Sequence, residues 1–178
     1  MIYDVAIIGG GPGGYTAALY CVRSGLSAVV LEKLSPGGQM AATNIVDNYP
    51  GFEEGIDGFT LGQKMKAGAE RFGAQTVLAE VKSADLKSKI KKIDSSEGVF
   101  EAKTVIIATG AEAKKLGLPE ETQLAGKGVA YCATCDGMFY KNKKVAVVGG
   151  GNSAVADALY LSNICKEVYL IHRRGELR

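Results

Sequence analysis

Apolar runs alternate with amphipathic stretches along the chain, and the first three predict a strand, a helix and a second strand. The apolar segment Tyr3–Ile8 is followed directly by glycines, which is typical of a buried strand. Segment Pro12–Ser24 has apolar residues at helical spacing, and Gly25 after it is a frequent helix stop. Ala28–Leu31 is a second apolar run, and it ends in Glu32. This order is typical of a parallel α/β sheet.

The middle of the chain predicts one helix and then several short strands. Thr60 is a candidate N-terminal cap and Gly73 a candidate stop for a helix with one apolar face. That face consists of Leu61, Met65, Ala69 and Phe72. A loop is expected at Ser35–Gln39, well before this helix. A small antiparallel meander is expected after it, over Gln75–Val81, Lys89–Asp94 and Val99–Ala102, followed by an apolar strand at Thr104–Ala108.

The strand–helix–strand pattern returns near the end of the chain. Val145–Val148 is an apolar strand, the segment after it predicts a helix to about Asn163, and Glu167–Ile171 predicts another strand. Between the two patterns, Leu116–Pro119 is typical of a crossing from one domain to the next.

A glycine-rich loop joins the strand to the helix in both patterns. The first loop has the spacing GxGxxG at Gly9, Gly11 and Gly14, and the second has GxGxxA at Gly149, Gly151 and Ala154. In such loops the first glycine permits a tight turn and the second lets the backbone approach a pyrophosphate. The third residue lets the helix pack closely on the strand. Free amides and the helix dipole favour phosphate there, so each pattern predicts a dinucleotide site.

The predicted fold is therefore α/β, with two Rossmann-like dinucleotide-binding units. Each unit is expected to be a parallel sheet with helices, and a small antiparallel meander accompanies the first. The predicted domains are residues 1–112 and residues 113–178.

The residue 23 positions after the first glycine differs between the two units. Glu32 holds this position in the first unit, whereas His172 holds it in the second and is followed by Arg173 and Arg174. A carboxylate accepts hydrogen bonds from ribose hydroxyls and repels a 2′-phosphate, while paired arginines bind that phosphate. We therefore expect NADPH in the second unit and a nucleotide with a free ribose in the first.

Two cysteines lie between the glycine-rich loops, in the sequence Cys132-Ala-Thr-Cys135-Asp136. This spacing allows a small disulfide across one turn, and a helix N-terminus acidifies a thiol into the reactive thiolate. Asp136 is a candidate acid–base group or, alternatively, a helix-capping acid. A zinc site is disfavoured because no second cysteine or histidine pair completes four ligands. Cys21 and Cys165 are expected to be inert.

Composition and charge narrow the function classes. Of the 178 residues, 47% are hydrophobic and 22% charged, which is ordinary for a globular protein. The net charge of +2 is too small to indicate nucleic-acid or membrane binding. No apolar stretch approaches the ~18 residues of a membrane span, and no secretory signal is recognisable. We expect a cytoplasmic protein, where a CxxC is more often catalytic or metal-binding than structural.

Together, these motifs resemble those of the low-molecular-weight thioredoxin reductases of bacteria, within the pyridine nucleotide-disulfide oxidoreductase family. The matching segments are Gly9–Ala18, Gly37–Gln39, Asn48–Gly51, Ile107–Ala111, Cys132–Gly137, Gly149–Ala154 and His172–Arg174. They follow the family's order from one end of the chain to the other. The Cys-Ala-Thr-Cys-Asp-Gly segment between two dinucleotide motifs is highly specific.

The resemblance implies an NADPH-dependent thioredoxin-disulfide reductase, with FAD in the first domain and NADPH in the second. It implies hydride transfer from NADPH to the flavin, followed by reduction of the Cys132–Cys135 disulfide. Cys135 would face the flavin, Cys132 would attack the disulfide of thioredoxin, and Asp136 would be the acid–base group. It further implies a homodimer and a rotation of the NADPH domain.

The resemblance also assigns the residues that bind the two cofactors. For FAD these are Gly9, Gly11, Pro12, Gly13, Gly14, Glu32, Lys33, Gly38, Gln39, Asn48, Val81, Thr109, Gly110 and Ala111. For NADPH they are Gly151, Asn152, Ser153, Ala154, His172, Arg173, Arg174 and Arg178.

Two alternatives remain open beside this function, and a ferredoxin-driven relative is disfavoured. The family's chain is longer, so these residues are expected to belong to a longer protein and, alone, to bind FAD without turnover. The partner could be a peroxiredoxin system, although those relatives carry an additional N-terminal dithiol domain. A ferredoxin-driven relative would have no need of Arg173 and Arg174.

Overall fold

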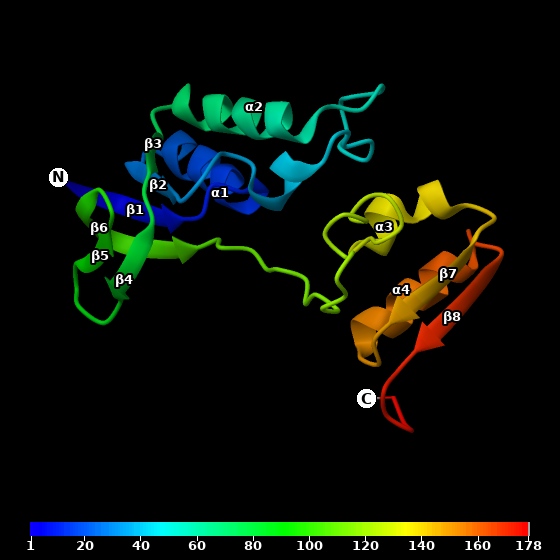
Figure 1. Cartoon of the computed structure of the whole chain (residues 1–178). Helices are drawn as coiled ribbons and strands as arrows, with labels where there is room; N and C mark the ends of the chain where they lie inside the picture. The colour runs from blue at the N-terminus through cyan, green and yellow to red at the C-terminus, as the bar shows by residue number, and fades with distance from the viewer. Residues whose placement is uncertain (178) are drawn as a thin grey trace. The chain divides into compact units, whose positions relative to one another are not determined.

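The computed structural model describes residues 1–177 and separates the chain into two compact units (Figure 1). Unit 1 is Met1–Ala111, and unit 2 is Glu112–Arg178, described to residue 177. Arg178, an expected NADPH contact, lies outside the described residues. No helix of residues 1–177 combines the length and the apolar character that crossing a membrane requires.

Unit 1 is built on one six-stranded sheet. Its elements are β1 (Ile2–Ile8), α1 (Pro12–Arg23), β2 (Ala28–Glu32), the 3-10 helix η1 (Gly38–Ala42), α2 (Gly58–Glu70), β3 (Gln75–Leu78), β4 (Val81–Asp85), β5 (Lys91–Ser95) and β6 (Gly98–Ile107). The strand order is β3-β2-β1-β6-β5-β4. The strands β3, β2, β1 and β6 are parallel, while β6, β5 and β4 are antiparallel.

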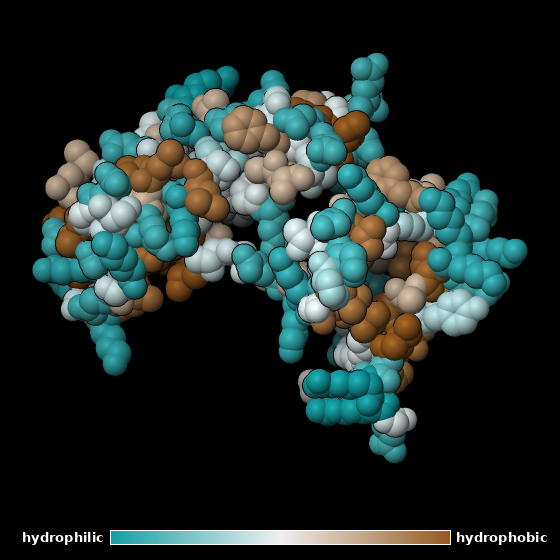
Figure 2. All heavy atoms as spheres, viewed as in Figure 1, coloured by the Kyte–Doolittle hydropathy of each residue, from teal (hydrophilic) through white to brown (hydrophobic). Residues whose placement is uncertain are grey.

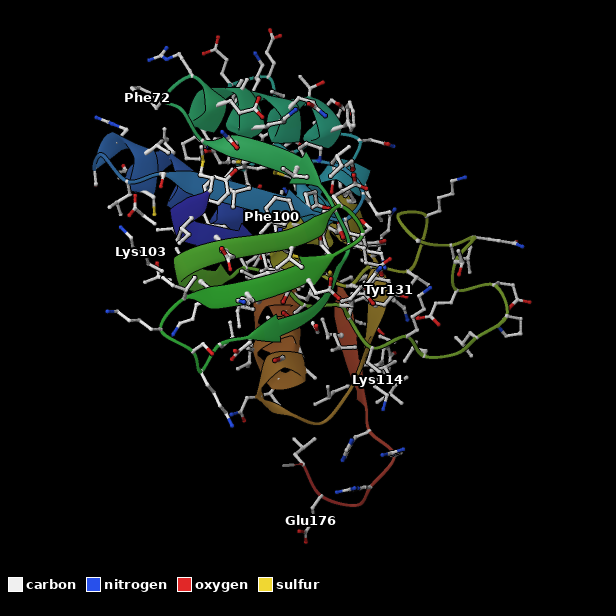
Figure 3. The ribbon with its side chains drawn as sticks, turned by 90° about the vertical axis from the view of Figure 1, so that its left-hand side faces the viewer. Phe72, Phe100, Lys103, Lys114, Tyr131 and Glu176 are labelled. Carbon is white, nitrogen blue, oxygen red and sulfur yellow. A yellow bond between two sulfur atoms is a disulfide. The ribbon has the colours of Figure 1, made fainter. Side chains whose placement is uncertain are left out.

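The structure corrects the predicted meander at both of its ends. The segment Gln75–Leu78 is not antiparallel, because it pairs in parallel with β2. Helix α2 lies between β2 and β3 in the chain and forms the crossover connection that a parallel pair of strands requires. The predicted strands Val99–Ala102 and Thr104–Ala108 are one strand, β6. Lys103 does not interrupt it, because its side chain is exposed and its ammonium bonds Asp4 at 2.7 Å (Figure 3).

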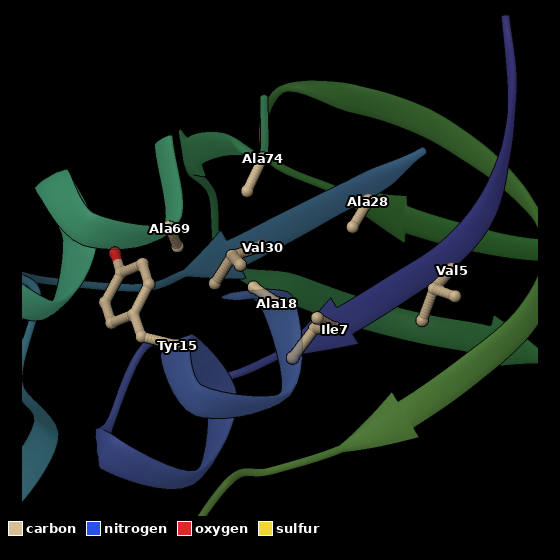
Figure 4. Packing of buried hydrophobic residues seen from close by; sticks show 8 residues of the cluster. All are labelled: Val5, Ile7, Tyr15, Ala18, Ala28, Val30, Ala69 and Ala74. Carbon is tan, nitrogen blue, oxygen red and sulfur yellow. The ribbon is translucent and has the colours of Figure 1, made fainter. Parts of the chain in front are cut away.

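The two faces of the sheet carry two separate hydrophobic cores. Side chains alternate along each strand, so Val5 and Ile7 of β1 face one core and Ala6 faces the other. Helices α1 and α2 cover the first core, into which Tyr15 inserts (Figure 4). The second core includes Ile93 of β5, with Phe100 of β6 packed against it. The apolar run of β2 is buried over Ala28–Leu31 because both of its faces are covered.

Helix α2 differs from its prediction at both termini. Its N-terminal cap is Asp57, whose carboxylate accepts the Thr60 N–H at 2.8 Å, so Thr60 lies inside the helix. The helix ends at Glu70, and Phe72 is 44% exposed rather than on the buried face. The guanidinium of Arg71 lies 4.9 Å from the Phe72 ring centroid, an attraction that favours an exposed ring. The expected loop at Ser35–Gln39 continues into η1.

Unit 2 contains a smaller, two-stranded parallel sheet. Its elements are α3 (Ala133–Asp136), the 3-10 helix η2 (Gly137–Tyr140), β7 (Lys144–Val148), α4 (Asn152–Ser162) and β8 (Glu167–Ile171). Strands β7 and β8 pair in parallel, and α4 packs against both. Leu161 is the one buried hydrophobic residue among those described in this unit. Val148, Tyr169 and Ile171 are about half exposed, and apolar side chains reach the surface (Figure 2).

Candidate active site

The first glycine-rich loop leaves the start of α1 open. Gly9 has φ +106°, and a Cβ at Gly14 would overlap the carbonyl oxygen of Gly9. A Cβ at Gly13 would meet nothing within 4 Å. Gly11 is the extended N-cap, and no side chain caps the helix. The first amides of α1 are therefore accessible to a phosphate, which is the cradle that a dinucleotide needs.

Glu32 lies at the carboxyl end of β2, beside this loop. Its Oε2 accepts the Gly10 N–H at 2.6 Å, and its Oε1 accepts the Leu34 N–H at 3.0 Å. The neighbouring Lys33 forms a 2.7 Å ion pair with Glu80, which raises the pKa of Lys33. Glu80 directly precedes Val81, so the ion pair joins the residue after Glu32 to the residue before Val81.

Two further predicted segments lie against the loop. The Gly37 N–H donates to the Gly10 carbonyl at 2.8 Å, and Gly38, which precedes Gln39, lies alongside Gly11. The segment Thr109–Ala111 follows β6, whose end lies against Gly9.

Asn48 lies in a different surrounding from the other predicted FAD contacts. It belongs to the loop 47–53, which lines a shallow concavity of its own. Its role as a flavin contact stays a prediction.

The second glycine-rich loop also leads into a helix without a side-chain cap, and here the loop packs against His172. Gly149 has φ +154°, and Gly151 is the extended N-cap of α4 without a side-chain cap. A Cβ at Gly150 would overlap the imidazole of His172, whose Nε2 is buried without a hydrogen-bond partner among residues 1–177. Arg173 and Arg174 follow β8 and are exposed. The basic residues therefore lie at the carboxyl end of β8, next to an open helix N-terminus.

Cys132 and Cys135 form a disulfide, with 5.3 Å between their Cα atoms. Cys132 is the N-cap of α3, and its Sγ accepts the Cys135 N–H at 3.2 Å. The Thr134 hydroxyl oxygen lies 3.4 Å from the same sulfur. Cys135 is exposed and Cys132 half-buried. A sulfur that accepts a backbone N–H in this way is suited to carry the negative charge of a thiolate.

Asp136 follows the disulfide directly and is partly buried. This burial raises the pKa of Asp136 above its ordinary value, so it holds a proton to higher pH than an exposed aspartate. Its side chain makes no capping hydrogen bond to η2, which it precedes. Cys132, Asp136 and Tyr140 line an open cavity of about 770 Å³, whose other walls include residues of β7 and α4. The capping role therefore has no hydrogen bond to support it, and the acid–base role of Asp136 stays a prediction.

Comparison with known proteins decides the family. The family described as pyridine nucleotide-disulphide oxidoreductase matches residues 3–178. The chain belongs to this family. Thioredoxin reductases of the pyridine nucleotide-disulphide oxidoreductase family use FAD and NADPH as cofactors.

Thioredoxin reductases are similar in sequence to nearly the whole of this chain. That of Vibrio cholerae is 49% identical over 97% of this chain and 54% of its own length, and that of Bacillus subtilis is 48% identical over 99% and 56%. The crystal structure of thioredoxin reductase from Streptococcus pyogenes has a TM-score of 0.87 at 45% identity, covering 99% of this chain and 57% of that one. The chain thus spans little more than half the length of these relatives.

Sequence reasoning overlooked the glycine in the middle of each loop. Gly10 contacts Glu32, and Gly150 contacts His172. The space beside the middle glycine is therefore occupied by a carboxylate in unit 1 and by an imidazole in unit 2. The signal was present, because both pairs are 22 residues apart. The two nucleotide units of this oxidoreductase are therefore alike in local geometry as well as in motif.

Proposed function

We propose that this protein is an NADPH-dependent flavoprotein that reduces the disulfide of thioredoxin. The observation that carries the proposal is the Cys132–Cys135 disulfide, set in sequence between two open dinucleotide loops. Its support is the 48–49% identity to thioredoxin reductases over nearly the whole chain. The proposal includes a homodimer in the cytoplasm, where thiols are kept reduced.

Unit 1 is the proposed FAD-binding domain. The α1 amides after Gly11 would hold the pyrophosphate, and Glu32 would accept hydrogen bonds from the ribose. Both oxygens of Glu32 already accept backbone N–H groups, which fixes the carboxylate for that contact.

Unit 2 is the proposed NADPH-binding domain. The segment Gly151–Ala154 would hold the pyrophosphate at the start of α4, and His172, Arg173 and Arg174 would face the 2′-phosphate. The bound cofactors would together supply the electron pair that opens the disulfide.

The chain's own residues then carry out thiol–disulfide exchange. The Cys132 thiolate attacks one sulfur of the thioredoxin disulfide and forms a mixed disulfide, releasing a thiolate. Cys135 attacks the Cys132 sulfur, re-forms the Cys132–Cys135 bond and releases the second thioredoxin thiolate. Asp136 accepts the proton of the attacking thiol and returns it to the leaving thiolate. Two electrons thereby pass to thioredoxin, together with this proton from Cys135 and the proton that Cys132 released to solvent when it ionised.

Exchange with thioredoxin can be tested on this chain without cofactors. The chain is reduced, freed of reductant and mixed with oxidised thioredoxin. We expect wild type to reduce thioredoxin stoichiometrically, and Cys132→Ser and Cys135→Ser each to abolish the transfer. Cys135→Ser should also accumulate a mixed disulfide through Cys132. The matched controls, Cys21→Ser and Cys165→Ser, change unpaired cysteines and should behave as wild type. Transfer by Cys132→Ser would contradict the assignment.

The partner and the turnover of these 178 residues are separate parts of the proposal. A peroxiredoxin-system partner in place of thioredoxin is the second candidate, and a mixed disulfide with that protein alone would favour it. We also propose that these residues alone bind FAD without steady-state turnover, because hydride transfer needs both nucleotides held in reacting geometry.

A further inference from the structure

Glu121 is a buried carboxylate that the proposed exchange reaction does not use. The residue is 3% exposed. Its Oε1 accepts the Leu116 N–H at 2.8 Å and the Tyr131 hydroxyl at 2.5 Å, and its Oε2 accepts the Gly117 N–H at 2.8 Å. Burying a carboxylate is costly unless its oxygens are bonded. The segment is therefore folded so that three donors converge on one side chain.

Both partners of the phenol–carboxylate bond respond to it. The Tyr131 hydroxyl, together with the backbone N–H groups, holds the pKa of Glu121 below its usual range. The same carboxylate raises the pKa of Tyr131. The two directions agree, and they describe an ionised Glu121 bonded to a neutral phenol.

This cluster lies one residue from the disulfide. Tyr131, which is labelled in Figure 3, directly precedes Cys132. Cys132 has an extended backbone, with φ −134° and ψ 104°, and is the N-cap of α3. The loop between Glu121 and Tyr131 is closed by the Val129 N–H bond to the Leu124 carbonyl at 2.9 Å. The backbone just before α3 is thus anchored to Glu121 through the Tyr131 hydroxyl.

We propose that Glu121 is a positioning residue for the Cys132–Cys135 pair and acts through Tyr131. By fixing the chain before Cys132, it keeps the two sulfurs together and favours the disulfide over the open dithiol. Holding two reacting groups in place raises their effective concentration. The inference rests on the proposed function, which makes this pair redox-active.

The measurement is the thiol–disulfide equilibrium of the 178-residue chain in dithiothreitol buffers. Two protein thiols give two electrons and two protons to oxidised dithiothreitol, and the S–S bond forms. Differential alkylation and mass spectrometry of the peptide with both cysteines give the oxidised fraction. We expect Tyr131→Phe to lower the equilibrium constant for disulfide formation about tenfold, which is about 30 mV toward easier reduction. Glu121→Gln should shift it in the same direction.

Tyr169→Phe is the matched control. It also removes a tyrosine–glutamate hydrogen bond in unit 2, from Tyr169 to Glu167 at 2.6 Å, and it should keep the wild-type equilibrium. An unchanged equilibrium in Tyr131→Phe, or an equal shift in both tyrosine variants, would overturn the role of Glu121 and leave the proposed function intact. A wild-type pair that is neither reduced nor reoxidised would overturn the proposed function as well.

Discussion

Asp136 has opposite effects on stability and on the proposed chemistry. Because burial raises the pKa of Asp136, the folded chain binds this proton more tightly than the unfolded chain. The stability that this proton contributes is present below the unfolded pKa, about 3.9, and is lost as pH rises through the folded pKa. At neutral pH the partly buried carboxylate therefore lowers the free energy of unfolding.

We expect Asp136→Asn to raise the midpoint of thermal unfolding at pH 7 while it slows exchange with thioredoxin. At pH 3 the wild-type carboxyl is protonated as well, and the two midpoints should converge. Circular dichroism melts at both pH values, together with the stoichiometric exchange assay, provide the measurement. A variant less stable by the same margin at both pH values would show that burial of the charge is not the cause.

At the scale of elements, the contact between α1 and its preceding loop depends on one glycine. A Cβ at Gly14 would overlap the Gly9 carbonyl oxygen, and a backbone atom cannot move aside cheaply. Gly14→Ala should therefore lower the free energy of unfolding of unit 1 by about 2 kcal/mol. Gly13→Ala is the control on the same helix, since its Cβ meets open space. That variant should be neutral or gain up to about 1 kcal/mol.

Urea unfolding followed by circular dichroism distinguishes the two glycine variants. Equal stabilities of Gly14→Ala and Gly13→Ala would show that the loop adapts to a methyl group. FAD titration of the same samples would report whether the loop keeps its shape.

The sequence predicted those elements whose pattern reflects local constraints. The two glycine-rich loops, the apolar strands around them and the disulfide were found, because steric fit and buried strands restrict residue type directly. The direction of β3 was not predicted correctly. Gln75–Leu78 is only four residues long, and its composition does not distinguish a parallel from an antiparallel neighbour. The Glu121–Tyr131 bond joins residues ten apart in irregular backbone, where no periodicity marks it.

At the scale of the whole molecule, the two units differ in how much they bury. Of the 16 buried hydrophobic residues in the described part of the chain, Leu161 alone belongs to unit 2. Apolar burial is the main stabilising contribution to folding. We therefore expect unit 2 to open at a lower free-energy cost than unit 1.

Hydrogen exchange with mass spectrometry tests this difference directly. Amides of β7, α4 and β8 should exchange faster than those of β1, β2 and β6, and a mild urea concentration should widen the gap. Equal protection of both sets of strands would contradict the expectation and indicate that the chain unfolds as one cooperative unit.

The exposed stretch 111–120 has a practical consequence for preparing the protein. All ten residues are exposed and outside helices and strands, and Lys114 and Lys115 lie among them. Exposed irregular backbone is the preferred substrate of proteases, so brief trypsin digestion offers a route to each unit as a separate sample. Cleavage after Lys115 would leave the donors at Leu116 and Gly117 on the same piece as Glu121. The redox segment could then be studied by NMR as a small protein.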